Sequence, residues 1–232
     1  AFGRFIGSLG GRYITAEDVG THVDDMDYIY QETDRVVGVH RVHGGSGDPS
    51  PFTAYGTLQG IKACLLRKFG HDDPGRESFA VQGVGSVGYY LTKYLREAGA
   101  KVMVCDINEN RVERAVDELG AEAVPMDQIY DTDARVFAPC ALGGVINEDT
   151  VPRLKCDIVA GSANNQLESE EWGTALEERG IEVLIVSLRK PTDPAIHEMH
   201  RKIRAEVLYG TADIASTRNF QGYEPGSYVF TL

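Results

Sequence analysis

The stretch SFAVQGVGSVGYYLTKYLREAGAKVMVCD, residues 78 to 106, decides the fold. It begins with a short apolar run, passes through three glycines at G-x-G-x-x-G spacing, and continues from Val87 to Ala98 with apolar residues at helical spacing. Gly99 closes this segment, a second apolar run covers residues 101 to 105, and Asp106 stands at its end, eighteen residues past the last of the three glycines. This order predicts the strand, glycine turn, helix and second strand of a mononucleotide-binding β-α-β unit.

Each glycine of the turn has a physical role in binding a dinucleotide. Gly83 permits the tight turn after the strand, Gly85 lets backbone N–H groups approach a pyrophosphate, and Gly88 allows the helix to pack closely on the sheet. The phosphates then lie at the helix N-terminus, where unpaired N–H groups and the helix dipole favour an anion. The other expected cofactor-binding residues of this turn are Val84, Ser86 and Val87.

Asp106 indicates which dinucleotide is bound. Its carboxylate can accept hydrogen bonds from the adenosine ribose hydroxyls, and its charge repels a 2′-phosphate, so the sequence favours NAD over NADP. G-x-G-x-x-G alone is a weak signal, and the flanking strand, helix and acid strengthen it. A purely structural turn and a methyltransferase-like binder are the alternatives.

Composition and charge restrict the class of protein. The chain has 232 residues, 42% of them hydrophobic, which suffices for a sizeable core. No apolar run approaches the roughly 20 residues of a membrane span, and the first residues lack the order of a signal peptide. A net charge of −12 argues against nucleic acid as a partner, and four cysteines without a CxxC pair are typical of reduced thiols. We therefore expect a soluble, cytoplasmic protein with neither a membrane nor a nucleic-acid partner.

Apolar and helical segments alternate along the chain. Before the glycine turn we expect a helix ending at Leu9, a strand over residues 12 to 15, a helix over 22 to 32 capped by Thr21, a loop over 38 to 51 and a long helix over 53 to 69. After Asp106 the pattern predicts helices over 111 to 119 and 168 to 179, and strands over 122 to 124, 135 to 138, 157 to 160 and 181 to 186. Strands separated by helices predict a doubly wound parallel sheet, a Rossmann-type α/β fold.

Two loops follow apolar strands, APCALGG at 138 to 144 and AGSANNQL at 160 to 167. Ligands bind at the carboxyl edge of open α/β sheets, so both loops are expected at the binding edge.

Several motifs occur together in one order: TAEDVGT, DPSPFTAYG, VQGVGSVG, CDIN, APCALGG and AGSANNQL. Over about residues 1 to 183 this arrangement resembles the Glu/Leu/Phe/Val amino-acid dehydrogenases, most of all their leucine-type members. The resemblance implies NAD-dependent oxidative deamination of a branched-chain L-amino acid to its 2-oxo acid and ammonium. It also implies two domains, with residues 1 to 52 the remnant of a substrate and catalytic domain and 53 to 187 the NAD-binding domain.

The resemblance assigns roles to individual residues. Asp18 matches the family's catalytic aspartate, which moves protons at the reacting nitrogen and carbon; the alternative is a helix N-terminal acid satisfied by backbone amides. Ala16 matches a small residue of the side-chain pocket, and Thr53 a threonine near substrate and nicotinamide that is also a candidate N-cap. The loops beside the cofactor would contribute Ala138, Cys140, Ala141, Ala160, Gly161, Ala163 and Asn164.

Two other residue types have simpler interpretations. Cys140 resembles a nucleophile only superficially, and we favour a small buried thiol. The pairs His40 with His43 and His197 with His200 have the spacing of metal ligands but lack matching companions, so we expect no metal site.

The sequence also departs from the family pattern. The family's substrate-binding and catalytic lysines lie upstream of the segment equivalent to Ala1, and no lysine here has their glycine-rich context. The chain lacks a starting Met and reads as though cut from a longer protein. Residues 188 to 232 form a divergent tail with one expected helix near residues 192 to 207. The alternative function is therefore a non-catalytic NAD-binding module or an oligomer-forming one, and a homo-oligomer is compatible with either function.

Overall fold

The computed structural model of this chain describes residues 1–18 and 20–184. By internal contacts the described residues divide into two compact units, 1–49 and 50–184. The divergent tail and its expected helix lie outside the described residues. None of the helices described is long and apolar enough to cross a membrane.

The first unit contains two short helices, α1 (Phe2–Ser8) and α2 (Val23–Tyr30), and a 3-10 turn, η1 (Arg41–His43). Its small core consists of Met26, Val36 and Val39. The strand expected over residues 12 to 15 is wrong: only a single parallel bridge joins Thr15 to Val36. Residues 11 to 14 are exposed, and without a continuous partner strand their backbone forms no ladder.

The cap predicted for α2 is also wrong. His22, rather than Thr21, precedes the helix, and its backbone N–H donates to Asp25 Oδ2 at 2.8 Å. The Thr21 hydroxyl instead accepts from the Asp18 backbone N–H at 2.9 Å. Thr21 therefore closes the turn that carries Asp18 and is not available to cap the helix.

The second unit begins with α3 (Ser50–Phe69), which starts three residues earlier than predicted. Pro51 fits the first turn because the N–H that proline lacks has no helical acceptor there. Thr53 consequently lies within the helix and is not its N-cap. Its carbonyl accepts a hydrogen bond from the Thr57 hydroxyl at 3.0 Å.

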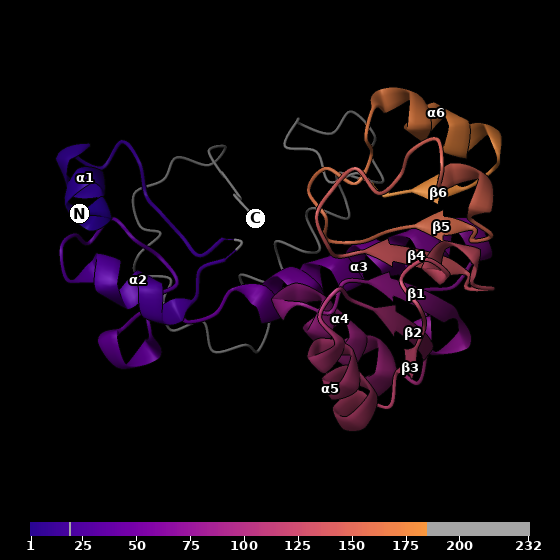
Figure 1. Ribbon diagram of the computed structural model, residues 1–232, viewed down its shortest axis with the longest axis horizontal. Coiled ribbons are helices and arrows are strands. Elements are labelled where there is room, and N and C mark those ends of the chain that lie inside the picture. Colours follow the sequence, from indigo (N-terminus) through magenta and orange to yellow (C-terminus); the bar gives the residue numbers. More distant parts are fainter. Residues whose placement is uncertain (19, 185–232) are drawn as a thin grey trace. The chain divides into compact units, whose positions relative to one another are not determined.

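Six parallel strands form the sheet of this unit, in the order β3-β2-β1-β4-β5-β6 (Figure 1). The strands are β1 (Ser78–Gln82), β2 (Lys101–Cys105), β3 (Glu122–Ala123), β4 (Val136–Pro139), β5 (Ile158–Val159) and β6 (Glu182–Val183). The doubly wound parallel fold predicted from the sequence is confirmed. The order reverses between β1 and β4, and the carboxyl ends of strands at such a switch point are where ligands bind in this architecture.

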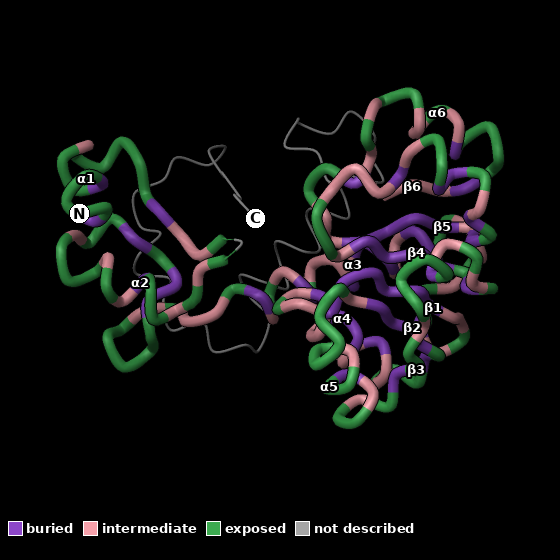
Figure 2. Tube along the Cα trace, in the orientation of Figure 1, coloured by how far each residue is buried: buried purple, intermediate pink, exposed green. Residues whose placement is uncertain are grey.

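Helices cover both faces of the sheet. One face packs against α3, α4 (Ser86–Glu97) and α5 (Glu109–Leu119), and the other against α6 (Glu170–Glu178) and the turns η3 (Ile129–Asp131) and η4 (Val151–Arg153). A further turn, η2 (Pro74–Arg76), leads into β1. The central strands β1, β2, β4 and β5 are buried along most of their length, whereas the edge strands β3 and β6 are exposed and half-buried (Figure 2).

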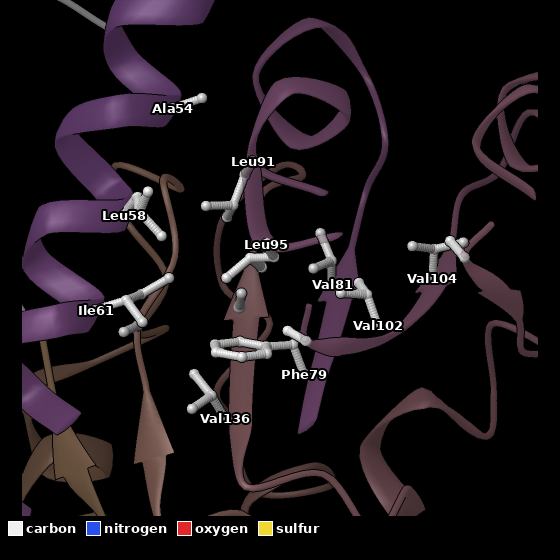
Figure 3. Close-up of a cluster of buried hydrophobic side chains, with 14 of the residues drawn as sticks. Ala54, Leu58, Ile61, Phe79, Val81, Leu91, Leu95, Val102, Val104 and Val136 are labelled. Carbon is white, nitrogen blue, oxygen red and sulfur yellow. The ribbon is translucent and has the colours of Figure 1, made fainter. Parts of the chain in front are cut away.

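Alternation along β1 shows why both faces are apolar. Phe79 and Val81 point to the α3 and α4 side, where they lie among Ile61, Leu91 and Leu95 (Figure 3). Ala80 belongs to the cluster on the opposite face. Burying each large side chain of this kind contributes about 1.5–3 kcal/mol relative to exposure. The packed sheet holds the loops at its carboxyl edge in fixed positions.

Candidate functional site

The glycine turn between β1 and α4 has the close approaches predicted for it. Gly83 has a φ of +91°, a conformation that side chains rarely adopt, and its backbone N–H donates to the Cys105 carbonyl at 2.8 Å. A Cβ on Gly88 would overlap the Gly83 carbonyl oxygen. The turn is therefore as tight as backbone atoms allow, and it brings the start of α4 directly onto the end of β1.

The N-terminus of α4 is partly exposed, with Gly85 half-buried and Ser86 exposed. Gly85 caps the helix without any side-chain hydrogen bond, and the first turn carries no acidic residue. Among the described residues, only Arg111 approaches the position that a Cβ on Gly85 would occupy, at 3.6 Å. The first N–H groups of a helix without a side-chain cap are suited to bind an anion. This geometry would allow a phosphate to approach Gly85, and the binding role of Gly85 stays a prediction.

Asp106 joins this turn to the loop after β2. Its Oδ2 accepts from the Val84 backbone N–H and its Oδ1 from the Asn108 backbone N–H, both at 2.9 Å. The side chain is only 6% exposed, yet a carboxylate has about four acceptor positions and two are occupied here. Asp106 can therefore hold the turn and still accept a ribose hydroxyl. The backbone at Gly85 and Gly88 fits the pyrophosphate of a dinucleotide, and the Asp106 carboxylate fits its adenosine ribose.

The two other predicted loops lie next to the turn at the same sheet edge. A Cβ on Gly83 would lie 2.8 Å from Ala141 Cβ, and the Cys140 backbone N–H donates to the Gln82 carbonyl at 2.7 Å. Gly161 packs against the Pro139 carbonyl, which also accepts from the Ala163 N–H at 3.0 Å. The structure thus brings the loops after β1, β4 and β5 together, and Ala138 and Ala160 are buried beneath them.

Not every residue of these loops is equally placed for binding. Ser86, Ala141 and Asn164 are exposed, Val87 and Ala163 are half-buried, and Val84 is buried. The exposed positions are accessible to a ligand through their side chains. The buried ones can contribute through backbone groups or by shaping the loop.

Cys140 is half-buried, and burial raises the pKa of its thiol, while hydrogen bonds with Ser162 lower that pKa in part. A raised pKa leaves little thiolate at neutral pH, so the residue is a poor nucleophile. The structure supports the interpretation of Cys140 as a small packing residue.

The residues assigned to substrate chemistry lie elsewhere in the chain. Asp18 is exposed and precedes the first residue of α2 by five positions, so it is not a helix N-terminal acid. Ala16, in the same loop, and Thr53, in the second unit, are half-buried. In the loop of Asp18, burial raises the pKa of Glu17, and the nearby charges of Asp48 and Asp25 raise it further, whereas His22 lowers it.

Of the histidines with metal-ligand spacing, His40 and His43 lie among the described residues, and both contact Asp27. His43 Nε2 lies 3.7 Å from Asp27 Oδ2, and the His40 backbone N–H donates to Asp27 Oδ1 at 2.9 Å. Within the described part of the chain, no group of three or more His, Cys, Asp or Glu side chains is arranged to hold a metal ion. His197 and His200 lie outside it.

The sequence interpretation missed two residues at this site. Ile107 is 87% exposed immediately after Asp106, and Arg111 lies 3.9 Å from the Asp106 carboxylate. The sequence offered two signals for them: an apolar residue directly after Asp106, and an arginine five positions after Asp106.

Comparisons with known proteins agree with this arrangement. A TrkA-N domain model matches residues 79–132. Leucine dehydrogenase of Thermoactinomyces intermedius is 57% identical over 181 residues, which cover 78% of this chain and 50% of that protein. Phenylalanine dehydrogenase of Bacillus thermotolerans is 45% identical over 186 residues, which cover 78% of this chain and 49% of that protein.

A solved structure gives the same result. L-tryptophan dehydrogenase from Nostoc punctiforme superposes with a TM-score of 0.66 at 34% identity, over 87% of this chain and 62% of that one. The chain spans about half the length of the curated relatives it matches. The resemblance predicted from the motifs is confirmed: the chain is similar to amino-acid dehydrogenases, among them the leucine and phenylalanine dehydrogenases.

Proposed function

We propose that this chain is part of an NAD-dependent dehydrogenase that oxidatively deaminates a branched-chain L-amino acid to its 2-oxo acid and ammonium. The observation that carries this proposal is the position of Asp106, whose carboxylate accepts the Val84 N–H at 2.9 Å beside the turn at Gly83 and Gly85. Identity of 57% to a leucine dehydrogenase supports the leucine-like substrate class.

Bound NAD would supply the hydride acceptor, and the protein's part is to bind and orient it. The N–H groups at the start of α4 would hold the pyrophosphate, and Asp106 would accept a ribose hydroxyl and repel a 2′-phosphate. The loops containing Ala141 and Asn164 would line the cofactor along the sheet edge.

Asp18 would transfer protons to and from the substrate. Deamination requires removal of a proton from the amino group and activation of a water molecule, and an exposed carboxylate can do both. Ala16 would leave room for a branched side chain, because its methyl group is small, and Thr53 would contact the substrate.

The first experiment measures NADH formation at alkaline pH from L-leucine and NAD, with the 232-residue chain and Asp18→Asn as the control. Calorimetry with NAD on the same samples follows binding separately. We expect Asp18→Asn to lower turnover by about 100-fold or more while NAD affinity stays within about two-fold, because general acid–base groups contribute on this order.

The other outcomes separate the alternatives. Binding without turnover would identify a non-catalytic NAD-binding module in this chain. Absence of NAD binding would overturn the proposal as a whole. L-Glutamate and L-phenylalanine serve as competing substrates, and a preference for either over L-leucine would contradict the branched-chain assignment.

A further inference from the structure

Arg111 lies over the glycine turn. It is the third residue of α5, and its Nη1 atom is 3.9 Å from Asp106 Oδ1 and 3.6 Å from the position of a Cβ on Gly85. Its side chain is 52% exposed, whereas that of Asp106 is 6% exposed. The guanidinium therefore lies at the solvent-facing side of the turn, close to both Asp106 and Gly85, the N-cap residue of α4.

Asp106 does not occupy the donors of this guanidinium. A separation of 3.9 Å exceeds hydrogen-bond length, so the two side chains form an ion pair without a hydrogen bond. Arginine presents a planar fork of donors that matches phosphate oxygens. The position of the Arg111 guanidinium and its planar set of donors are both suited to bind an anion at Gly85.

Arg114, one turn further along α5, differs from Arg111 in that neighbouring side chains bind its guanidinium group. Its Nε atom lies 3.2 Å from both Glu118 carboxylate oxygens, and its guanidinium stacks 4.0 Å from the centre of the Tyr89 ring. Arg114 is thus held by neighbouring side chains of α4 and α5. It provides a matched control on the same helix.

We propose that Arg111 binds a phosphate of the adenosine half of the dinucleotide and so helps to determine cofactor affinity and specificity. This inference rests on the proposed dinucleotide site and not on turnover. Two phosphates share the required chemistry: the pyrophosphate, expected beside Gly85, and the 2′-phosphate of NADP, expected beside Asp106. Arg111 would moderate the repulsion that Asp106 exerts on the second of these.

The test uses three fragments of the cofactor with the full chain. Adenosine carries no phosphate, 5′-ADP carries the pyrophosphate, and 2′-AMP carries only the 2′-phosphate. Dissociation constants from NMR titration are compared for wild type, Arg111→Gln, Arg111→Lys and the control Arg114→Gln. Thermal unfolding of each variant checks that its fold is retained.

We expect Arg111→Gln to weaken binding of 5′-ADP, 2′-AMP or both by about ten-fold, the scale of one charge-assisted hydrogen bond, with adenosine changed less than about two-fold. A loss confined to 5′-ADP assigns Arg111 to the pyrophosphate, and one confined to 2′-AMP assigns it to the 2′-phosphate. Arg111→Lys should recover part of the affinity, since it keeps the charge and loses the fork. Arg114→Gln should leave all three constants unchanged.

Equal effects of Arg111→Gln on all three ligands, or no effect on any, would overturn the role of Arg111. Failure of the wild-type chain to bind 5′-ADP would overturn the dinucleotide site itself. The two failures are distinguishable because the second is visible without any substitution.

Discussion

Asp106 serves the site in two ways. It accepts N–H groups from Val84 and Asn108 at 2.9 Å each, which ties the glycine turn to the loop after β2, and it is the acceptor proposed for the ribose. A substitution therefore removes structural hydrogen bonds together with the ligand contact. The consequences can be separated only by measuring stability and affinity on the same variant.

We predict that Asp106→Ser raises the NAD dissociation constant by about ten-fold or more and reduces discrimination against NADP, because the repelling charge and a ribose acceptor are both lost. The loss of the acceptor for the N–H group of the buried Val84 should lower the free energy of unfolding by about 1–3 kcal/mol. Calorimetry with NAD and NADP, together with urea unfolding, measures both effects. Asp106→Asn controls for shape, and unchanged selectivity in both variants would refute the assigned role.

Helix α4 is the element on which the site depends, because its N-terminus faces the expected phosphate and its inner face forms part of the core. Leu91 and Leu95 are fully buried against the sheet, and Gly88 touches the backbone of Gly83. The helix cannot move outward without opening the core or inward without a clash. Its N–H groups are therefore positioned before any ligand arrives.

We predict that Gly88→Ala destabilises the protein by about 1–3 kcal/mol and weakens NAD binding, because the added methyl group forces α4 away from β1. Gly56→Ala in α3 is the matched control: apart from its chain neighbours and the backbone of its own helix, no described residue has a heavy atom within 4 Å of the added methyl position. That substitution should stabilise by about 0.5–1 kcal/mol, since alanine loses less entropy in a helix. Urea unfolding monitors both, and equal stability of Gly88→Ala and wild type would contradict the tight turn.

Across the whole molecule, burial dominates the chemistry of the thiols. Burial raises the pKa of Cys64 to about 12, and those of Cys105 and Cys156 to about 11, from an ordinary value of 9.0. Nearby groups have smaller effects in both directions: Glu182 raises the pKa of Cys64, whereas a hydrogen bond with the Gly83 backbone lowers that of Cys105. All three thiols thus stay neutral in the folded protein at pH values where an unfolded chain would ionise them.

This difference predicts a loss of stability at alkaline pH. The contribution is fully present below pH 9 and is lost as pH rises through the folded pKa values of about 11 to 12, because only the unfolded chain releases these protons between the two limits. Each thiol contributes at most about 1.4 kcal/mol per pH unit in that range. Urea unfolding in reductant at pH 8, 9.5 and 10.5 measures the slope, and Cys64→Ala should reduce it. An identical slope in wild type and Cys64→Ala would exclude this contribution.

The fold could be predicted from sequence with few errors within the second unit. Periodicity located β1, β2, α4 and α5 within about two residues, since strands and helices there are apolar at regular spacing. The errors lie in the first unit and at its border, where the strand over residues 12 to 15, the cap at Thr21 and the start of α3 were wrong. Short exposed segments carry weak local signals, and neighbouring groups decide their structure.

For the candidate site, the sequence identified the glycines, Asp106 and the loops that follow β4 and β5, because turn chemistry and the positions of strand ends are local properties. It did not show that Asp106 bonds to Val84, twenty-two residues away, or that Ala141 packs on Gly83. It gave no role to Arg111, which acquires one only from its distance to Gly85. The sequence by itself determined the order of strands and helices in the second unit and the resemblance to a family of dehydrogenases. Only the tertiary structure decided which side chains meet, because such contacts depend on how the sheet aligns loops distant in the chain.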